Sequence, residues 1–301
     1  MHRHFRHQPV DGVGLAGRSH VRSSPHSSAR VARLFSANSG PWWLHDVDKL
    51  QANSPASHAL SYVKQPIDMS HSDRLPRPIA VEDRSRAGEA RQFSPSAARN
   101  RGPIRDVLTR VLSKKGLVLE IGSGSGEHVV CFAEALPRLV WLPSDPDTVS
   151  RASIKAWIAA EGLANVRAPV AIDVRRETWD VEDYAPFDAM ISLNMIHIAP
   201  WEAALGLLAG AGRLLRPDGV LFLYGPFMLG GVHTAASNAA FDADLKRRDK
   251  RWGVRDVDEL VSEAAPYGLE LREVVKMPAN NLSLVFVKAN PAHHATAADT
   301  G

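Results

Sequence analysis

The chain has 301 residues, of which 45% are hydrophobic, with 36 Lys and Arg, 33 Asp and Glu and one cysteine. This length fits one large domain or two small ones, and the hydrophobic share excludes a chain that is disordered throughout. Cys131 alone cannot form an internal disulfide framework or a cysteine-based zinc site, and the absence of an apolar run of about 18 residues excludes a membrane-spanning helix.

Charge is unevenly distributed along the chain. Residues 1–85 carry 11 Lys and Arg against 7 Asp and Glu, whereas the other 216 residues carry 25 against 26. Sequence-independent binding to nucleic acid needs clustered cations, and none stands out in the near-neutral part of the chain. The charge there favours a small-molecule substrate over a nucleic acid.

Residues 1–85 are unlike a folded domain. Residues 1–40 are rich in Arg, His, Ser and Gly, with Asp11 as their only acid, and no helical or strand period persists. We expect a disordered extension. One alternative is an organelle transit peptide, a class rich in Arg and Ser and poor in acids, and another is a segment from a wrongly chosen start codon. The histidines of this segment are expected to be solvated rather than to bind a metal.

From about residue 86 onward, helices and strands are predicted to alternate. Ser94 is a good N-cap with Pro95 at the first helical position, so a helix is predicted to begin there. Short apolar runs predict seven strands, at Leu117–Ile121, Leu139–Leu142, Val170–Val174, Phe187–Leu193, Val220–Tyr224, Leu269–Met277 and Leu282–Lys288. Apolar spacing, caps and turn signals predict further helices at Val129–Leu136, Thr148–Ala160, Trp201–Leu215, Ser237–Arg248 and Asp256–Ala265.

This order predicts an α/β domain over residues 86–290, followed by a flexible tail at 291–301. Alternating strands and helices with short connections imply a mostly parallel sheet with helices on both faces. Only residues 278–281 link the last two strands, which is too short for a parallel crossover, so these strands are predicted to form an antiparallel hairpin.

The strongest functional signal is a glycine-rich loop at residues 122–126, between the first predicted strand and a helix. Glycines there let a ligand approach the backbone, although an ordinary strand-to-helix turn has the same composition. A dinucleotide-binding loop needs a small residue at position 127, where Glu127 would repel a pyrophosphate, and a P-loop lysine is absent. Glu120 followed by G-x-G-x-G instead resembles the first motif of class I methyltransferases, which bind S-adenosylmethionine. The residues predicted to bind it here are Glu120 and, in the loop, Gly122, Ser123, Gly124 and Gly126.

Two acids follow the next strands. Asp145 lies 19 residues after Gly126, about the distance at which an acid can accept hydrogen bonds from both ribose hydroxyls. Asp147, by contrast, is placed to cap the helix that follows. Asp173, with Val174 beside it, resembles the residue that contacts the adenine amino group in this fold. For both Asp145 and Asp173 the alternative is an acid in a solvated turn.

Polar residues also follow the fourth and fifth strands. Because ligands of open α/β sheets bind beyond the carboxyl ends of the strands, Asn194 is predicted to lie beside the cofactor. His197, Tyr224 and His233 are candidates to accept or relay a proton from a substrate, and His233 lies in a glycine-flanked loop that we expect to act as a lid. Packed structural roles are the alternative for each of the three.

Four longer segments resemble one known family, at residues 93–100, 194–201, 223–227 and 277–283. Their amino-acid sequences are similar to those of the "domain of unknown function 938" family, which includes the methyltransferase-like 26 proteins. The resemblance covers about residues 88–288. It implies a class I methyltransferase fold with sheet order 3-2-1-4-5-7-6, and it implies no particular substrate.

The sequence thus predicts an S-adenosylmethionine-dependent methyltransferase that acts on a small or medium-sized acceptor with an O, N or S nucleophile. From their place before the first strand, Arg99 and Asn100 are expected to close over the methionine end of the cofactor. The alternatives are a non-catalytic protein that binds the cofactor or a partner, and an NAD(P)-dependent oxidoreductase, against which Glu127 argues. A cytoplasmic location is expected. The sequence does not indicate the oligomeric state.

Overall fold

The computed structural model describes residues 89–292. The predicted extension at 1–85 lies outside these residues, as does most of the predicted tail at 291–301. The domain boundaries therefore stay predictions.

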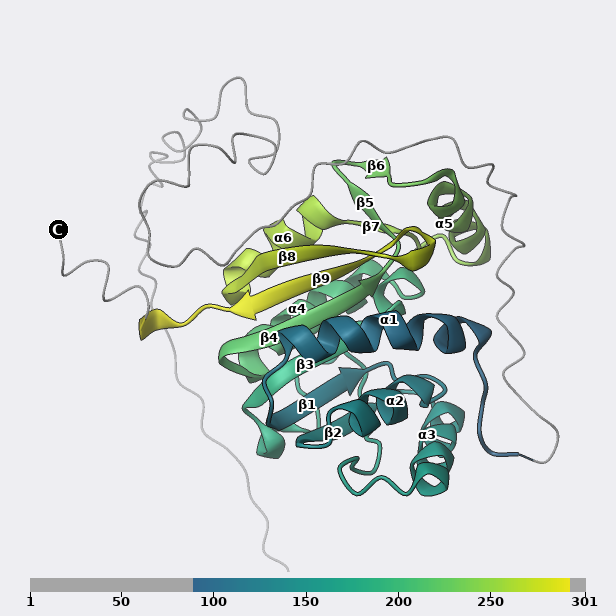
Figure 1. The fold of residues 1–301 in the computed structure, drawn as a ribbon. Coiled ribbons are helices and arrows are strands. Elements are labelled where there is room, and N and C mark those ends of the chain that lie inside the picture. Colours follow the sequence, from purple (N-terminus) through teal and green to yellow (C-terminus); the bar gives the residue numbers. More distant parts are fainter. Residues whose placement is uncertain (1–88, 293–301) are drawn as a thin grey trace, which may run out of the picture. The chain divides into compact units, whose positions relative to one another are not determined.

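The main sheet has six strands in the order β2-β1-β3-β4-β9-β8 (Figure 1). Its strands are β1 (Gly116–Ile121), β2 (Leu139–Ser144), β3 (Phe187–Leu193), β4 (Leu215–Gly225), β8 (Leu269–Met277) and β9 (Asn281–Lys288). The first four are mutually parallel, whereas β9 is antiparallel to both β4 and β8. The predicted mostly parallel sheet and its final antiparallel hairpin are therefore confirmed.

The predicted strand at 170–174 was wrong, and for this reason the sheet has six strands instead of seven. Beyond β2 the chain makes only isolated bridges, from Val166 to Trp141 and from Val170 to Ser144. Pro169 lies between them and has no N–H to donate to a ladder, a residue that sheets tolerate only at their edges. The remaining six strands keep the relative order that the family resemblance implied.

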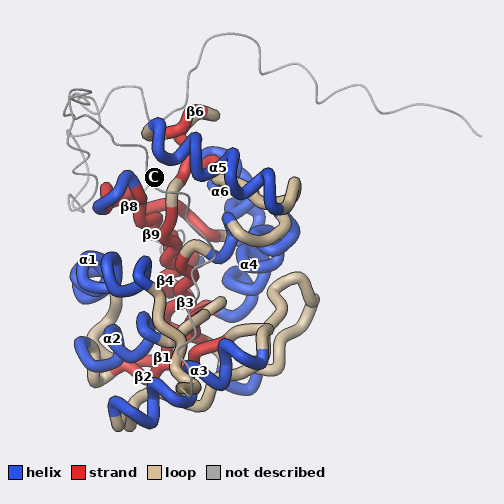
Figure 2. Tube along the Cα trace, turned by 90° about the vertical axis from the view of Figure 1, so that its right-hand side faces the viewer, coloured by secondary structure: helices blue, strands red, loops and turns tan. Residues whose placement is uncertain are grey.

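Helices cover both faces of this sheet, with α1 and α2 on one face and α4 and α6 on the other (Figure 2). The helices are α1 (Pro95–Val111), α2 (Glu127–Ala135), α3 (Thr148–Glu161), α4 (Trp201–Leu214), α5 (Ala236–Arg248) and α6 (Val257–Ala264). Ser94 caps α1 as predicted, by accepting a hydrogen bond from Ala97 N. Ser237 does not cap α5, which begins one residue earlier and has no side-chain cap.

A small second sheet lies beyond the carboxyl ends of the parallel strands (Figure 1). It has the order β6-β5-β7 and consists of β5 (Phe227–Leu229), β6 (Val232–His233) and β7 (Arg255–Asp256). Gly230 and Gly231, both with positive φ, make the turn between β5 and β6. The region predicted as a glycine-flanked lid is thus a short hairpin. Its turn is attached to β7 by a hydrogen bond of 2.6 Å that Gly231 N donates to Asp256 Oδ2.

Two glycines in helices offer a test of this packing. A Cβ on Gly210 in α4 would lie 2.0 Å from the ring of Trp179, whereas a Cβ on Gly102 in α1 would meet nothing within 4 Å. We expect Gly210→Ala to destabilise the fold by about 2 kcal/mol or more through overpacking. Gly102→Ala should instead stabilise it by roughly 0.5–1 kcal/mol through helix propensity. Urea unfolding of both variants measures the difference, and equal effects would contradict the close packing of α4.

Candidate functional site

The glycine-rich loop between β1 and α2 is held against the end of β2. Gly122, Gly124 and Gly126 have φ values of +70°, +56° and +94°, in the region that favours glycine. Ser123 N donates to Ser144 O at 2.8 Å, and the Ser123 hydroxyl accepts a hydrogen bond from Ser144 N at 3.2 Å. The loop therefore has one defined backbone path, with glycines at three of its turns.

Two of these glycines have close neighbours at the position where a side chain would begin. A Cβ on Gly126 would lie 2.9 Å from Cα of Ile154 in α3, and a Cβ on Gly122 would lie 3.1 Å from the side chain of Met195. The loop is thus packed against α3 on one side and against η4 (Met195–His197), the 3₁₀ turn after β3, on the other. This places the ends of β1 and β3 next to each other.

The carboxylate of Asp145, just beyond β2, faces the loop. It accepts hydrogen bonds from Gly124 N at 3.0 Å and from Asp147 N at 2.9 Å. The residue is only 8% exposed, and this burial raises the pKa of its carboxyl group. Asp147 accepts a hydrogen bond from Ser150 N at 2.7 Å and so caps α3. The predicted cap at Asp147 is therefore confirmed, whereas the ribose-binding role of Asp145 stays a prediction.

Glu120 lies one residue before the end of β1 and is 1% exposed. Its Oε2 atom has no hydrogen-bond partner among the described residues. Burial, together with repulsion from Asp145, raises the pKa of the Glu120 carboxyl to about 7, although the nearby Ser123 hydroxyl partly opposes this. An unpaired carboxylate in such a place favours a cationic ligand.

Glu127, which argued against a dinucleotide, connects the loop to α1. Its carboxylate accepts hydrogen bonds from Ser94 N at 2.6 Å and from the Ser125 hydroxyl at 3.1 Å. The side chain is 4% exposed, so it fills the start of α2 instead of leaving space there. A pyrophosphate at this helix start would meet a buried acid.

Helix α1 brings Arg99 and Asn100 to the end of β4. The Asn100 side-chain oxygen lies 2.7 Å from Nε2 of His128 in α2. Burial raises the pKa of Tyr224, although the nearby side chains of Asn100, Asn281 and Arg99 partly oppose this effect. Asn281 lies at the start of β9.

The structure therefore brings Arg99, Asn100 and Tyr224 together as one polar cluster. Sequence reasoning missed the contributions of His128 and Asn281, and it considered for Asn281 only a role in the hairpin turn. The signal that would have found them was their position. His128 directly follows Glu127 in the loop motif, and Asn281 lies in one of the four segments that carry the family resemblance.

Asp173 and Val174 lie apart from this cluster. Asp173 is in a turn, where it accepts hydrogen bonds from the Arg175 guanidinium at 2.9 Å and 2.6 Å, and this ion pair lowers the pKa of its carboxyl. Val174 is buried, and a Cβ on Gly206 of α4 would lie 2.0 Å from its carbonyl oxygen.

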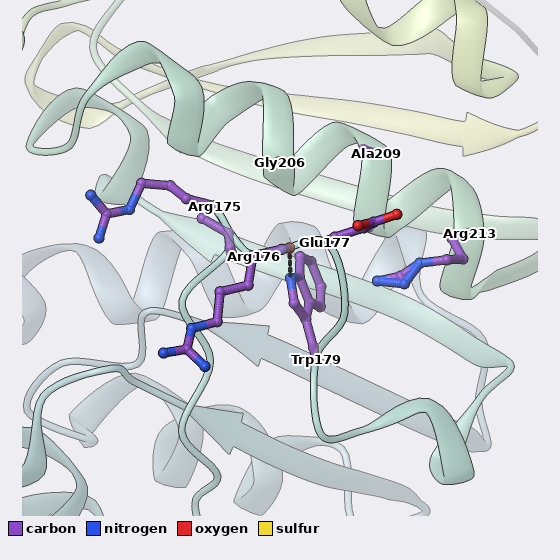
Figure 3. A pocket seen from close by; sticks show the side chains of 9 residues that line it. Arg175, Arg176, Glu177, Trp179, Gly206, Ala209 and Arg213 are labelled. Atoms are coloured by element: carbon purple, nitrogen blue, oxygen red, sulfur yellow. Dashed lines mark hydrogen bonds between the residues drawn. The ribbon is translucent and has the colours of Figure 1, made fainter. Parts of the chain in front are cut away.

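A pocket of about 360 Å³ opens between this turn and α4 (Figure 3). Trp179 lines this pocket, and its indole N–H donates a hydrogen bond to Arg176 O at 3.1 Å. Arg175 and Arg213 at its rim are paired with Asp173 and Glu182. Val174 is the only predicted site residue in its lining. The pocket is thus separate from the loop motif.

Asn194 and His197 follow β3 as predicted. Asn194 has φ +61°, and its N–H donates to Tyr224 O at 2.8 Å. His197 is completely buried, packs edge-on against Phe227 at 4.8 Å between ring centroids, and has no partner for either ring nitrogen among the described residues. Burial, with repulsion from Arg255, lowers the pKa of His197 to about 3, so its imidazole is neutral.

His233, in β6, faces α5. Its Nε2 atom lies 3.5 Å from Oδ2 of Asp242, which is 6% exposed. The candidate residues thus form two groups, one around the glycine-rich loop and one beyond the ends of β3 and β4. Among residues 89–292 no three His, Cys, Asp or Glu side chains are arranged to hold a metal ion. Within the same residues no helix combines the length and apolarity needed to cross a membrane.

Comparison with known proteins identifies the fold. The family described as "Protein of unknown function (DUF938)" matches residues 91–288. A tRNA (guanine-N(7)-)-methyltransferase from Rhodopseudomonas palustris strain BisA53 is 35% identical over 110 residues, which is 34% of this chain and 42% of that protein. The chain thus spans less than half the length of this relative.

Solved structures of other proteins are similar to this one. An O-methyltransferase family protein from Burkholderia thailandensis superposes with a TM-score of 0.54 and 16% identity, over 63% of this chain and 56% of that one. CalO1, a methyltransferase of calicheamicin biosynthesis in its SAH-bound form, superposes with a TM-score of 0.52 and 19% identity, over 64% and 54%. At such identities the likeness shows the fold, which is the Rossmann-like fold of class I methyltransferases.

Proposed function

The chain belongs to the DUF938 family, and we propose that it is an S-adenosylmethionine-dependent methyltransferase that acts on a small or medium-sized molecule. The relative named as a tRNA methyltransferase matches only about a third of this chain. The near-neutral charge of residues 86–301, with 25 Lys and Arg against 26 Asp and Glu, favours a metabolite over a nucleic acid as the acceptor.

The observation that carries this proposal is the pair of buried carboxylates at the glycine-rich loop. Glu120 and Asp145 repel each other, and Glu120 leaves one oxygen without a partner among the described residues. Positive φ at three glycines gives the loop a backbone path that leaves its N–H groups free of side chains of its own. S-adenosylmethionine carries an ammonium and a sulfonium group, so its charge fits this site, whereas the charge of a dinucleotide does not.

Each residue then has a definite role in binding. Asp145 accepts the ribose hydroxyls, Glu120 faces the positive charge, and Gly122, Ser123, Gly124 and Gly126 form the loop around the methionine portion. Arg99 and Asn100 close the site from α1, and Asn194 borders it from β3. Asp173 and Val174 are proposed for the adenine, although in the structure Asp173 is bound to Arg175.

When bound, S-adenosylmethionine supplies an activated methyl group on a sulfonium. Positioning the acceptor in line with that group therefore contributes much of the rate. Tyr224, which lies near Asn100 and Asn281, is proposed to orient the acceptor. His197 is proposed as a neutral hydrogen-bonding group beside it, because a pKa of about 3 makes it a weak proton acceptor.

Replacement of Glu120 by glutamine tests this assignment with two opposite effects. The folded-state pKa of about 7 lies above the usual value, so the wild-type carboxyl contributes stability at low pH that is lost as the pH rises from about 4.5 to 7. We expect Glu120→Gln to be more stable than the wild type at pH 8, by about 2–3 kcal/mol in urea unfolding, and equally stable near pH 4. The same variant should bind S-adenosylmethionine at least about tenfold more weakly.

Binding of S-adenosylmethionine to Glu120→Gln with wild-type affinity would contradict the role of this carboxylate. A second readout is available in the wild type, where binding of a cation should release protons near pH 7. Calorimetry in buffers of different ionisation enthalpy measures this release, and it should vanish in Glu120→Gln.

A further inference from the structure

The turn that carries Asp145 is closed by an arginine of α3. The Arg151 guanidinium donates from Nη1 to Asp145 O and to Pro146 O, both at 2.8 Å. Its Nη2 atom donates to the Thr148 hydroxyl at 3.2 Å. One side chain therefore spans the connection from the end of β2 to the first residue of α3.

The backbone and the side chain of Asp145 are held by different groups. The carboxylate accepts hydrogen bonds from Gly124 N at 3.0 Å and from Asp147 N at 2.9 Å, whereas the carbonyl oxygen accepts the one from Arg151. Because the carbonyl and the side chain branch from neighbouring backbone atoms, holding the carbonyl also limits where the carboxylate can point. Arg151 thus fixes the part of Asp145 that the glycine-rich loop does not reach.

The charge of Arg151 acts on the same carboxylate. Burial raises the pKa of the Asp145 carboxyl, and repulsion from Asp147 adds to this, whereas the hydrogen bonds from Gly124 N and Asp147 N and the charge of Arg151 lower it. Glu120 and Asp145 repel each other across the loop. Arg151 is therefore the cation that favours the ionised form of Asp145.

The stability of α3 does not explain an arginine at this position. Arg151 lies in the N-terminal part of Thr148–Glu161, close to the positive end of the helix dipole, where a cation is unfavourable. Asp147 already caps the helix by accepting a hydrogen bond from Ser150 N. What Arg151 contributes is its set of hydrogen bonds to the turn.

We propose that Arg151 is a positioning residue for the cofactor, which orients Asp145 towards the ribose of S-adenosylmethionine. This rests on the proposed function, in which Asp145 accepts hydrogen bonds from the ribose hydroxyls. Arg151 acts on the turn and needs no contact with the ligand. An acceptor that is already oriented before the ligand arrives lowers the cost of binding.

Calorimetric titration of the full chain with S-adenosylmethionine tests this role, because charge and positioning predict opposite effects. The cofactor carries a net positive charge, so the loss of a nearby cation by itself would leave its affinity unchanged or increase it. We expect instead that Arg151→Gln and Arg151→Lys each bind about tenfold more weakly, since a lysine cannot span two carbonyls and a hydroxyl.

Lys155→Gln is the matched control for the charge. Lys155 is exposed and lies one turn after Arg151 on the same face of α3. This variant loses the same charge from the same helix but leaves the turn at Asp145 intact, so it should bind S-adenosylmethionine with wild-type affinity. An equal loss of affinity in Lys155→Gln and Arg151→Gln would contradict the positioning role.

The pH dependence of binding is a readout that a merely structural role would not move. Affinity should fall towards low pH as Asp145 takes up a proton, and in Arg151→Gln this fall should begin at a higher pH than in the wild type. Arg151→Lys keeps the charge, so its profile should keep the wild-type position at lower affinity. Glu120 titrates in each of these proteins, so its effect cancels when their profiles are compared.

The ligand-free protein gives a second measurement, a carbon-13 NMR titration of the aspartate carboxyl groups in the full chain. The pKa of Asp145, assigned by loss of its signal in Asp145→Asn, should rise in Arg151→Gln and stay unchanged in Lys155→Gln. An unchanged Asp145 titration in Arg151→Gln overturns the inference. Unchanged cofactor affinity in both Arg151 variants, in a protein whose binding depends on Asp145, overturns it as well. A wild type that does not bind S-adenosylmethionine would instead overturn the proposed function.

Discussion

Asp145→Ala is expected to weaken S-adenosylmethionine binding by about 100-fold or more. The wild-type carboxylate is held by Gly124 N and Asp147 N at the end of β2, so it is already oriented before a ligand arrives. Hydrogen bonds from two ribose hydroxyls to a charged acceptor contribute roughly 1.5–3 kcal/mol each, and both are lost in the variant. Isothermal titration calorimetry on the full chain measures the change.

Asp147→Ala is the matched control for this prediction. Asp147 lies two residues away and caps α3 through Ser150 N. Its removal should cost about 1 kcal/mol of folding stability and leave the affinity nearly unchanged. Equal losses of affinity in Asp145→Ala and Asp147→Ala would show that the effect comes from local unfolding and not from a contact with the ribose.

Gly126→Ala is expected to have the largest effect on the glycine-rich loop. Its φ of +94° already disfavours a side chain, and a Cβ would lie 2.9 Å from the backbone of Ile154. Because backbone atoms of α3 cannot move without displacing the helix, we expect a loss of about 2–4 kcal/mol in stability, together with loss of S-adenosylmethionine binding. Urea unfolding and calorimetry on the same preparation test both parts.

Gly162→Ala separates the two causes. Gly162 also has positive φ, at +61°, but nothing lies within 4 Å of its Cβ position. That variant should show only the conformational cost, roughly 1 kcal/mol, with unchanged binding. If Gly126→Ala behaves like Gly162→Ala, the loop does not pack against α3 as the structure describes.

Much of the fold could be predicted because most strands of the main sheet, such as β1, β2 and β3, are largely buried and consist of apolar runs. β3 and β8 have the predicted ends, and the glycines after β1 marked the start of α2. The predicted strand at 170–174 failed because apolar composition cannot distinguish a paired strand from an edge segment interrupted by Pro169. The β5–β6 hairpin was not predicted because its strands are only three and two residues long.

The residues around the glycine-rich loop could be predicted as one site because they lie close together in the sequence and have fixed spacing. The residues beyond the ends of β3 and β4 could be predicted only as separate candidates. Asp242 lies nine residues after His233 on a different element, so only the packing of α5 against β6 brings them together. The burial that turns His197 into a weak base depends on Gly225, Phe227 and Arg255, which no local pattern connects to it.

A calorimetric titration of the full chain with S-adenosylmethionine, with NADH as the control, decides whether this chain uses the methyltransferase cofactor. We expect micromolar binding of S-adenosylmethionine, loss of this binding in Asp145→Ala, and no measurable binding of NADH, since Glu127 fills the place of the small residue that a dinucleotide loop needs. Absence of binding, or tighter binding of NADH, would contradict the methyltransferase assignment and leave only the fold.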